Sequence, residues 1–430
     1  AALVELIAYR EFRPVPAEGE SEWGNARYGA YLLRRDSEPV WADLGEASRV
    51  EAQVQTFRAA LRTESEGGRV ALRAIGADVR TTGRALYETV LAPLASRLEG
   101  VRFLLVAPDG VLNLIPFAAL RDAEDRYLVE RYTLTHLTSG RDLLRLGEAQ
   151  ASGNPPVVIA APDYGALSAA AQQVAARSPQ APASRRSRDL TPLQWEPLPG
   201  ARLEGEALGK LLGVEALAGA DARESLLKQV HGPRLLHIAT HGFFLTDQQQ
   251  LLPQARAPGS QLPAGVSGSS FLRPPLGMGE NPLLRSGLAL AGANQRDEGA
   301  EDGILTALEM AGLDLTGTQL VVLSACDTGL GTVANGEGVY GLRRAVVMAG
   351  AEAQLTSLWR VSDEVTRKLM ESYYRRLIAG EGRAEALRVV QLGMLDDTWM
   401  RHPYYWASFV PIGTWKALSR TTESASIDER

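Results

Sequence analysis

Two short apolar segments end in the side chains that cysteine chemistry needs, and they constrain the fold of this chain more than any other feature. Residues 234–242 end in His241 and Gly242, and residues 319–329 carry Cys326, the only cysteine among 430 residues. Each segment has the length and aliphatic content of a buried strand. We expect one sheet that presents His241 and Cys326 just past the C-terminal ends of two strands, where the imidazole can activate the thiol.

Strand-like and helix-like segments alternate along most of the chain. Apolar runs typical of strands cover 101–107, 157–161 and 353–358, and helical spacing of apolar residues covers 203–212, 304–313, 339–349, 363–379 and 383–395. This alternation predicts an α/β fold with a mostly parallel sheet and helices on both faces. Ligands of such sheets bind beyond the C-terminal ends of the strands, where we expect His241 and Cys326.

The composition excludes several classes of protein. A formal net charge of −6 argues against a broad nucleic-acid surface, and a single cysteine excludes an internal disulfide framework and a thiolate zinc cluster. No apolar run reaches the roughly 18 to 20 residues that span a bilayer. We expect a cytoplasmic protein with no metal or other cofactor and with no nucleic-acid or membrane partner. The chain begins without Met in the middle of a strand-like pattern, so we also expect a fragment of a longer protein.

Segments without periodicity suggest how the chain is divided. Residues 146–156 contain two glycines and two prolines, which favours a boundary there. Two later stretches are long and lack apolar periodicity, which is typical of mobile insertions. We predict an N-terminal domain over residues 1–148 and a catalytic domain over residues 149–418. The catalytic domain has mobile insertions near 168–199 and 245–300, and residues 419–430 form a disordered tail.

Several segments together resemble the CHAT peptidases, which are cysteine proteases related to caspases and separase. The resemblance rests on His241-Gly242, on residues 324–329 around Cys326, and on residues 106–120, 357–363 and 403–409; it covers roughly residues 85–415. It implies a caspase-like sheet and hydrolysis of peptide bonds. It also implies that the first domain is a degenerate, non-catalytic caspase-like relative that packs against the second.

The proposed roles of the dyad follow from its chemistry. Cys326 attacks as a thiolate, and His241 removes the thiol proton and later protonates the leaving amine. The resemblance to caspases implies an oxyanion hole formed by the backbone N–H groups of Gly242 and Cys326. His237 lies on the same strand face about 13 Å further back, so we expect a structural role for it. The alternative for Cys326 is a buried structural cysteine.

Four residues are candidates for substrate binding. Asp363 lies where separase-like relatives place an acid that binds arginine, although Asp is equally a favoured helix N-cap. Ser324 has the position that lines the same pocket in caspases, and its small side chain leaves room for a long substrate side chain. Trp359 either borders the cleft or belongs to the core, and Glu337 either contacts substrate or is a first-turn acid. We predict cleavage after arginine, with lysine or a large apolar residue as second choice.

The leading functional hypothesis is a cysteine endopeptidase that cuts selected protein substrates. The resemblance implies that a protein partner or ligand activates or inhibits it, with tetratricopeptide repeats outside this fragment as a candidate route, as in bacterial regulated proteolysis. The alternatives are a catalytically silent CHAT-fold binding module and a non-peptidase cysteine hydrolase such as an amidase or acyltransferase. The presence of both Cys326 and His241 argues against the silent module.

Overall fold

The strands in the described part of the molecule form a single sheet. The computed structural model describes residues 1–15, 21–35, 37–62, 72–146, 152–166, 193–245, 281–295, 301–327, 337–359 and 362–419. Within these ranges the sheet has 13 strands in the order β10-β9-β8-β11-β12-β13-β5-β4-β1-β2-β3, with β6 and β7 continuing beside β8. Seven of its pairings are parallel and five antiparallel, which confirms the expected α/β fold with a mostly parallel sheet.

The strands have the following bounds: β1 (Ala2–Phe12), β2 (Trp23–Arg34), β3 (Ser37–Glu46), β4 (Phe103–Ala107), β5 (Thr133–His136), β6 (Val157–Pro162), β7 (Leu217–Gly219), β8 (Leu235–Phe244), β9 (Ser286–Ala289), β10 (Ile304–Thr306), β11 (Leu320–Asp327), β12 (Ala353–Ser357) and β13 (Phe409–Gly413). The α-helices are α1 (Ala47–Arg62), α2 (Leu72–Val90), α3 (Leu128–Arg131), α5 (Pro199–Leu212), α6 (Glu224–Lys228), α7 (Ala307–Met310), α8 (Glu337–Met348), α9 (Asp363–Ile378), α10 (Arg383–Asp396) and α11 (Pro403–Trp406). None of the described helices is long and apolar enough to cross a membrane.

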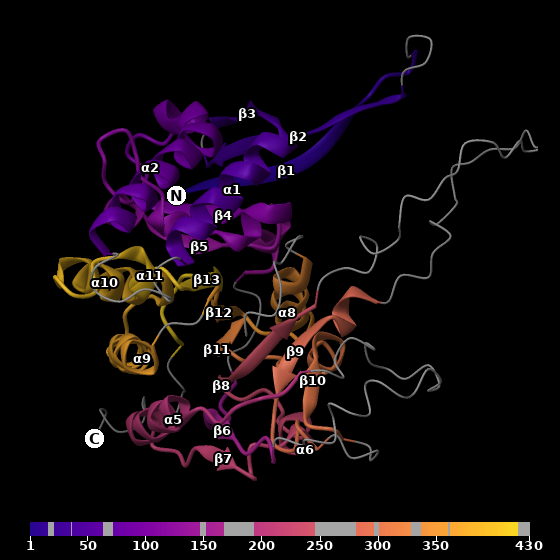
Figure 1. Cartoon of the computed structure of the whole chain (residues 1–430), viewed down its shortest axis with the longest axis vertical. Helices are drawn as coiled ribbons and strands as arrows, with labels where there is room; N and C mark the ends of the chain where they lie inside the picture. Colours follow the sequence, from indigo (N-terminus) through magenta and orange to yellow (C-terminus); the bar gives the residue numbers. More distant parts are fainter. Residues whose placement is uncertain are drawn as a thin grey trace, which may run out of the picture.

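Helices cover both faces of the sheet around β8 and β11. Successive strand residues point to opposite faces, so Leu236 and Ile238 of β8 join a core cluster with Val346 of α8. His237, on the other face, meets the hydroxyl of Tyr374 on α9, which packs against α5. The view in Figure 1 agrees, because α5 and α9 lie on one side of these strands and α8 on the other.

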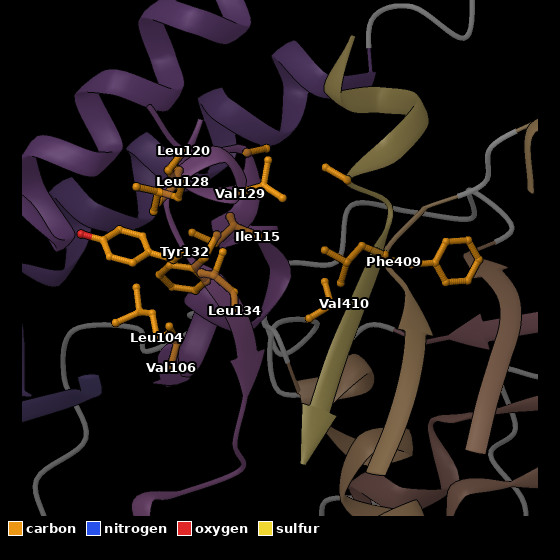
Figure 2. Close-up of a cluster of buried hydrophobic side chains, with 14 of the residues drawn as sticks. Leu104, Val106, Ile115, Leu120, Leu128, Val129, Tyr132, Leu134, Phe409 and Val410 are labelled. Atoms are coloured by element: carbon orange, nitrogen blue, oxygen red, sulfur yellow. The ribbon is translucent and has the colours of Figure 1, made fainter. Parts of the chain in front are cut away.

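The N-terminal and C-terminal strands are joined within one sheet. β13 pairs in parallel with β5 through Ile412 and His136. Figure 2 shows Val410 on the side of β13 that faces Leu134 and Val129 of the N-terminal part. These three residues belong, with Phe409 and Ile412, to one core cluster that takes side chains from both parts. The description of residues 1–148 as a separate degenerate domain stays a prediction.

A buried arginine also connects the two parts. Arg343 of α8 donates from Nη1 to the backbone oxygen of Asn113, 3.0 Å away, in the short 3₁₀ helix η2 (Gly110–Leu114). Among the described residues its Nε and Nη2 have no hydrogen bond. Burial lowers the pKa of this guanidinium to about 10. The helix that follows the cysteine strand is therefore held to the N-terminal part by a buried cation.

Parts of the two stretches expected to be mobile insertions are built into the core. Leu193 and Trp195 are buried, and residues 286–289 form the fully buried strand β9. Residues 304–306 are strand β10 rather than the start of a helix. These elements are too short to show a sequence period, which is why the prediction was wrong there. The remainder of both stretches, residues 168–192, 246–280 and 296–300, lies outside the described residues, as does the tail from 420.

Candidate active site

The backbone brings the two predicted catalytic residues side by side. β8 and β11 run parallel over eight register pairs, and one of these pairs joins Cys326 to His241. Neighbouring strands lie about 4.8 Å apart, and paired positions occupy the same face of the sheet. Two positions that are 85 residues apart along the chain are therefore direct neighbours. The side chain of Cys326 lies outside the described residues.

The imidazole of His241 is oriented by a backbone carbonyl. Its Nε2 lies 2.8 Å from the backbone oxygen of Glu196, and because a carbonyl can only accept, Nε2 is the donor. A neutral ring in this tautomer has its lone pair on Nδ1. The rings of Tyr164 and Trp195 flank the imidazole at centroid distances of 5.2 and 5.6 Å, and His241 is only 7% exposed. One ring nitrogen is thus held by a backbone acceptor, and Nδ1 is the nitrogen that a general base would use.

The segment that holds His241 was missed by the sequence analysis. The backbone N–H of Trp195 donates to Oδ1 of Asn294, and Nδ2 of Asn294 donates to the backbone oxygen of Trp195, both over 2.9 Å. These residues belong to the two stretches expected to be mobile. A large aromatic residue within an Ala, Arg, Ser and Pro-rich stretch is the signal that could have revealed them, because disordered segments contain few aromatics.

His241 and Gly242 lie inside a strand rather than past its end. β8 continues to Phe244, and Gly242 is in register with Leu288 of β9. A Cβ at Gly242 would lie 3.5 Å from Cβ of Ala325, an ordinary contact, so the local packing does not require glycine. The expectation that His241 lies just past the end of its strand is therefore wrong, because β9 extends the ladder beyond the histidine. The proposed role of the Gly242 and Cys326 N–H groups in an oxyanion hole stays a prediction.

A buried carboxylate that the sequence analysis did not single out lies on the same face of the sheet. Glu204 of α5 is 3% exposed, and its Oε2 accepts a hydrogen bond from Oγ of Ser324 over 3.3 Å. Its Oε1 lies 3.1 Å from Nε2 of His237, whose Nδ1 lies 3.1 Å from the Tyr374 hydroxyl. His237 is fully buried, in line with the structural role expected of it.

The spacing of α5 could have identified Glu204. It is flanked on the buried face of the helix by Ala201, Gly205 and Leu208, so a charged residue stands in the apolar stripe of an amphipathic helix. Glutamate is almost never buried without a partner or a function. The nearby hydroxyl of Tyr374 stays protonated, because burial raises its pKa and the charge of Glu204 raises it further.

Asp363 connects the N-terminal ends of two helices. It is the first residue of α9, whose N-cap is Ser362, and its Oδ2 accepts from the backbone N–H of Gly200 in α5 over 3.1 Å. A Cβ at Gly200 would lie 1.9 Å from Cβ of Asp363, so only glycine fits there. Asp363 thus caps the neighbouring helix rather than its own. Its role in substrate binding stays a prediction.

Trp359 and Glu337 are the other two candidates for substrate binding. Trp359 is 6% exposed in the shared core, and its Nε1 donates to the backbone oxygen of Tyr404 over 2.9 Å, so packing accounts for its position. Glu337 is the first residue of α8, and its side chain lies outside the described residues. In the described part of the chain, no three His, Cys, Asp or Glu side chains come together as metal ligands.

Comparison with known proteins gives relatives of two kinds. Two curated relatives, the mouse and human proteins named tetratricopeptide repeat protein 28, are each 28% identical over 344 residues, which is 77% of this chain but 13% of theirs. Among solved structures, Saccharomyces cerevisiae separase in complex with securin is 10% identical with a TM-score of 0.45, covering 96% of this chain and 30% of that one. The Arg-specific cysteine proteinase gingipain R is 9% identical with a TM-score of 0.39, covering 87% and 76%.

A family profile also matches most of the chain. The profile described as "CHAT domain" matches residues 80–414, which is more than three quarters of the 430 residues. The matched region begins within α2 and ends just after β13, so it includes the strand pair β8 and β11, the helices α5 and α9, and the junction with the N-terminal strands. This chain belongs to the CHAT domain family.

Proposed function

We propose that this chain is a cysteine endopeptidase in which Cys326 is the nucleophile and His241 its base. The observation that carries the proposal is the register pair between Cys326 and His241 on adjacent parallel strands. The hydrogen bond from His241 to the Glu196 carbonyl supports it, because that bond fixes the ring and leaves Nδ1 as the basic nitrogen. Membership of the CHAT family is consistent with this chemistry.

The proposed reaction follows the usual course for a thiol and an imidazole. Nδ1 of His241 takes the thiol proton, and the Cys326 sulfur bonds to the carbonyl carbon of the substrate. The C–N bond then breaks as the imidazolium protonates the leaving amine. Water releases the carboxylate product from the thioester and restores the thiol. The N–H groups of Gly242 and Cys326 are the proposed donors to the oxyanion.

Gating by a partner is the second part of the proposal. His241 is nearly buried beneath the Trp195 ring, which supports a resting state in which the base is covered. A protein partner that displaces the segment around Trp195 would uncover it. The curated relatives are named for tetratricopeptide repeats, which supports repeats outside this chain as the route by which such a partner acts.

The same burial of His241 favours a second candidate, a catalytically silent binding module. A fluorogenic peptide assay with the wild type and Cys326→Ala separates the two. If the chain is an endopeptidase, Cys326→Ala should abolish hydrolysis, because Cys326 is the only cysteine. The rate of alkylation of Cys326 by iodoacetamide should then rise with a pH midpoint below about 8.5, the pKa of a free thiol. Hydrolysis that survives Cys326→Ala, or a Cys326 thiol that titrates like a free cysteine, would contradict it.

A further inference from the structure

Asn294 lies in a turn that is bound to the end of β6. The turn follows β9, and the backbone N–H of Asn294 donates to the backbone oxygen of Tyr164 over 2.8 Å. Two residues earlier, the N–H of Gly292 donates to the backbone oxygen of Asp163 over 2.9 Å. The backbone of Asn294 is therefore fixed to the segment that carries the Tyr164 ring, which lies against His241.

The side-chain amide of Asn294 binds a further segment, the one around Trp195. Its Oδ1 accepts from the backbone N–H of Trp195, and its Nδ2 donates to the backbone oxygen of Trp195, both over 2.9 Å. Both backbone groups of one residue thus pair with a single amide, much as they would pair with a residue of a neighbouring antiparallel strand. The same Nδ2 donates to the backbone oxygen of Gly165 over 3.1 Å. The amide therefore joins residue 195 to the end of β6.

The carbonyl that orients His241 belongs to the next residue along the chain. Glu196 follows Trp195, and its backbone oxygen lies 2.8 Å from Nε2 of His241. Because the peptide unit between Trp195 and Glu196 is planar, a bond that holds the Trp195 oxygen also fixes the direction in which Glu196 begins. The amide of Asn294 thus acts within one residue of the acceptor that holds the imidazole.

The hydrogen bonds at this position require an asparagine. They use one acceptor and two donors on a short side chain, and only a primary amide supplies both kinds of group. A carboxylate would have no donor and would place a negative oxygen against two backbone carbonyls. Alanine would leave the backbone groups of Trp195 without these partners.

We infer that Asn294 is a positioning residue of the proposed dyad. It holds Trp195 so that the Glu196 carbonyl receives the Nε2 proton of His241, and this leaves Nδ1 for the proton of the Cys326 thiol. The inference rests on the proposed function. It gives the segment around Trp195 a role in orienting the base in addition to covering it.

Asn294→Ala tests the inference by steady-state hydrolysis of a fluorogenic peptide. We expect kcat to fall about 10- to 100-fold and KM to change less than about twofold, because the base is misplaced while no substrate contact is lost. Asn154→Ala is the matched control. Asn154 also donates from Nδ2 to a backbone oxygen, that of His231 over 2.8 Å, but it precedes β6 and lies at the opposite end of β6 and β8 from His241. Its kcat should stay within a factor of about two of the wild type.

The pH dependence of Cys326 alkylation is a second readout, and it needs no turnover. Both variants are first shown to be folded by circular dichroism. Asn294→Ala should raise the pH midpoint of the reaction with iodoacetamide toward about 8.5, the pKa of a free thiol, because the imidazole is no longer held in place to accept the proton. Asn154→Ala should keep the midpoint of the wild type. A general loss of stability would not move the midpoint of the folded protein.

NMR spectroscopy of protein labelled with ¹⁵N-histidine tests the contact without substrate or thiol chemistry. The chain has five histidines, so His241→Gln identifies the signal of His241. Its Nε2 proton, which the Glu196 carbonyl accepts, should be visible in the wild type and in Asn154→Ala and should be lost by exchange in Asn294→Ala. If Asn294→Ala fails to fold, Asn294→Asp replaces it, since the carboxylate keeps an acceptor for the Trp195 N–H and loses both donors; the same signal should be lost.

The outcomes separate this inference from the proposed function. A wild-type Cys326 that titrates like a free thiol, together with a His241 signal that depends on Asn294, would contradict the dyad and keep the positioning of His241. Hydrolysis that depends on Cys326, with kcat, alkylation midpoint and His241 signal unchanged in Asn294→Ala, would overturn the role of Asn294. A kcat that rises in Asn294→Ala would also overturn it, because the segment around Trp195 would then only cover the base.

Discussion

Two parallel strand pairs, one in each part of the sheet, carry a histidine in a similar place and differ in what surrounds it. In the C-terminal part, β8 and β11 pair His241 with Cys326. In the N-terminal part, β4 and β5 pair His136 with Val106. The Nε2 of His241 donates to a backbone carbonyl, whereas within the described part of the chain neither nitrogen of His136 has a hydrogen bond of normal geometry. The sheet provides the position, and the opposite residue and the orienting carbonyl provide the chemistry.

The surroundings of His136 explain why it is not a candidate for a general base. It is 4% exposed, and burial together with the charge of Arg343 lowers its pKa to about 3. The cavity that it lines with Phe117 and Leu387 has a volume of about 20 Å³. That is room for about one water molecule and for no substrate side chain.

Replacing each histidine in turn gives the largest expected difference between the two strand pairs. His241→Ala should lower kcat for a peptide substrate by about 10²- to 10⁴-fold, because a general base is lost. His136→Leu should leave kcat within a factor of about two, since this residue touches no reacting group. The measurement is steady-state hydrolysis by the full chain after circular dichroism has shown both variants to be folded. Equal losses in the two variants would break the comparison.

Acid stability should depend on His136. Its pKa in the folded state, about 3, lies below the value of 6.5 expected when unfolded, so the unfolded chain binds more protons between these limits. Its contribution is complete above pH 6.5 and is lost as the pH falls toward 3, at about 1.4 kcal/mol per pH unit.

Urea unfolding from pH 7 to pH 4 checks this expectation. The free energy of unfolding should fall more steeply for the wild type than for His136→Leu, while His231→Leu serves as a control because His231 is an exposed residue. Parallel curves for the wild type and His136→Leu would show that this histidine is not held neutral by burial.

A smaller effect should come from the contact between α5 and α9. Gly200→Ala places a Cβ against Asp363 and should destabilise the fold by about 1–3 kcal/mol through overpacking. Gly393 lies within α10 with nothing near its Cβ position, so Gly393→Ala should instead stabilise by about 0.5–1 kcal/mol. Chemical denaturation measures both. Stabilisation by Gly200→Ala would mean that α5 and α9 can separate without cost.

The sequence predicted β8 and β11 because each contains a continuous apolar run, although both strands continue past the residue expected beyond their ends. It also predicted that His241 and Cys326 meet, because parallel strands share one edge. It did not predict β9 or β10, which have four and three residues and no measurable period. The carbonyl of Glu196 and the carboxylate of Glu204 were missed for another reason: each acts across the fold, 45 and 120 residues from its partner.

The contact between Arg343 and Asn113 has a consequence for any shortened form of this protein. A chain that began near residue 149 would lose the carbonyl that receives this guanidinium, and β13 would become an open edge. Unpaired strand edges promote association with other chains, and a buried charge without a partner destabilises the fold. The first third of the molecule therefore stabilises the part that carries the cysteine strand. Removing it would leave both an unpaired strand edge and a buried guanidinium without its acceptor.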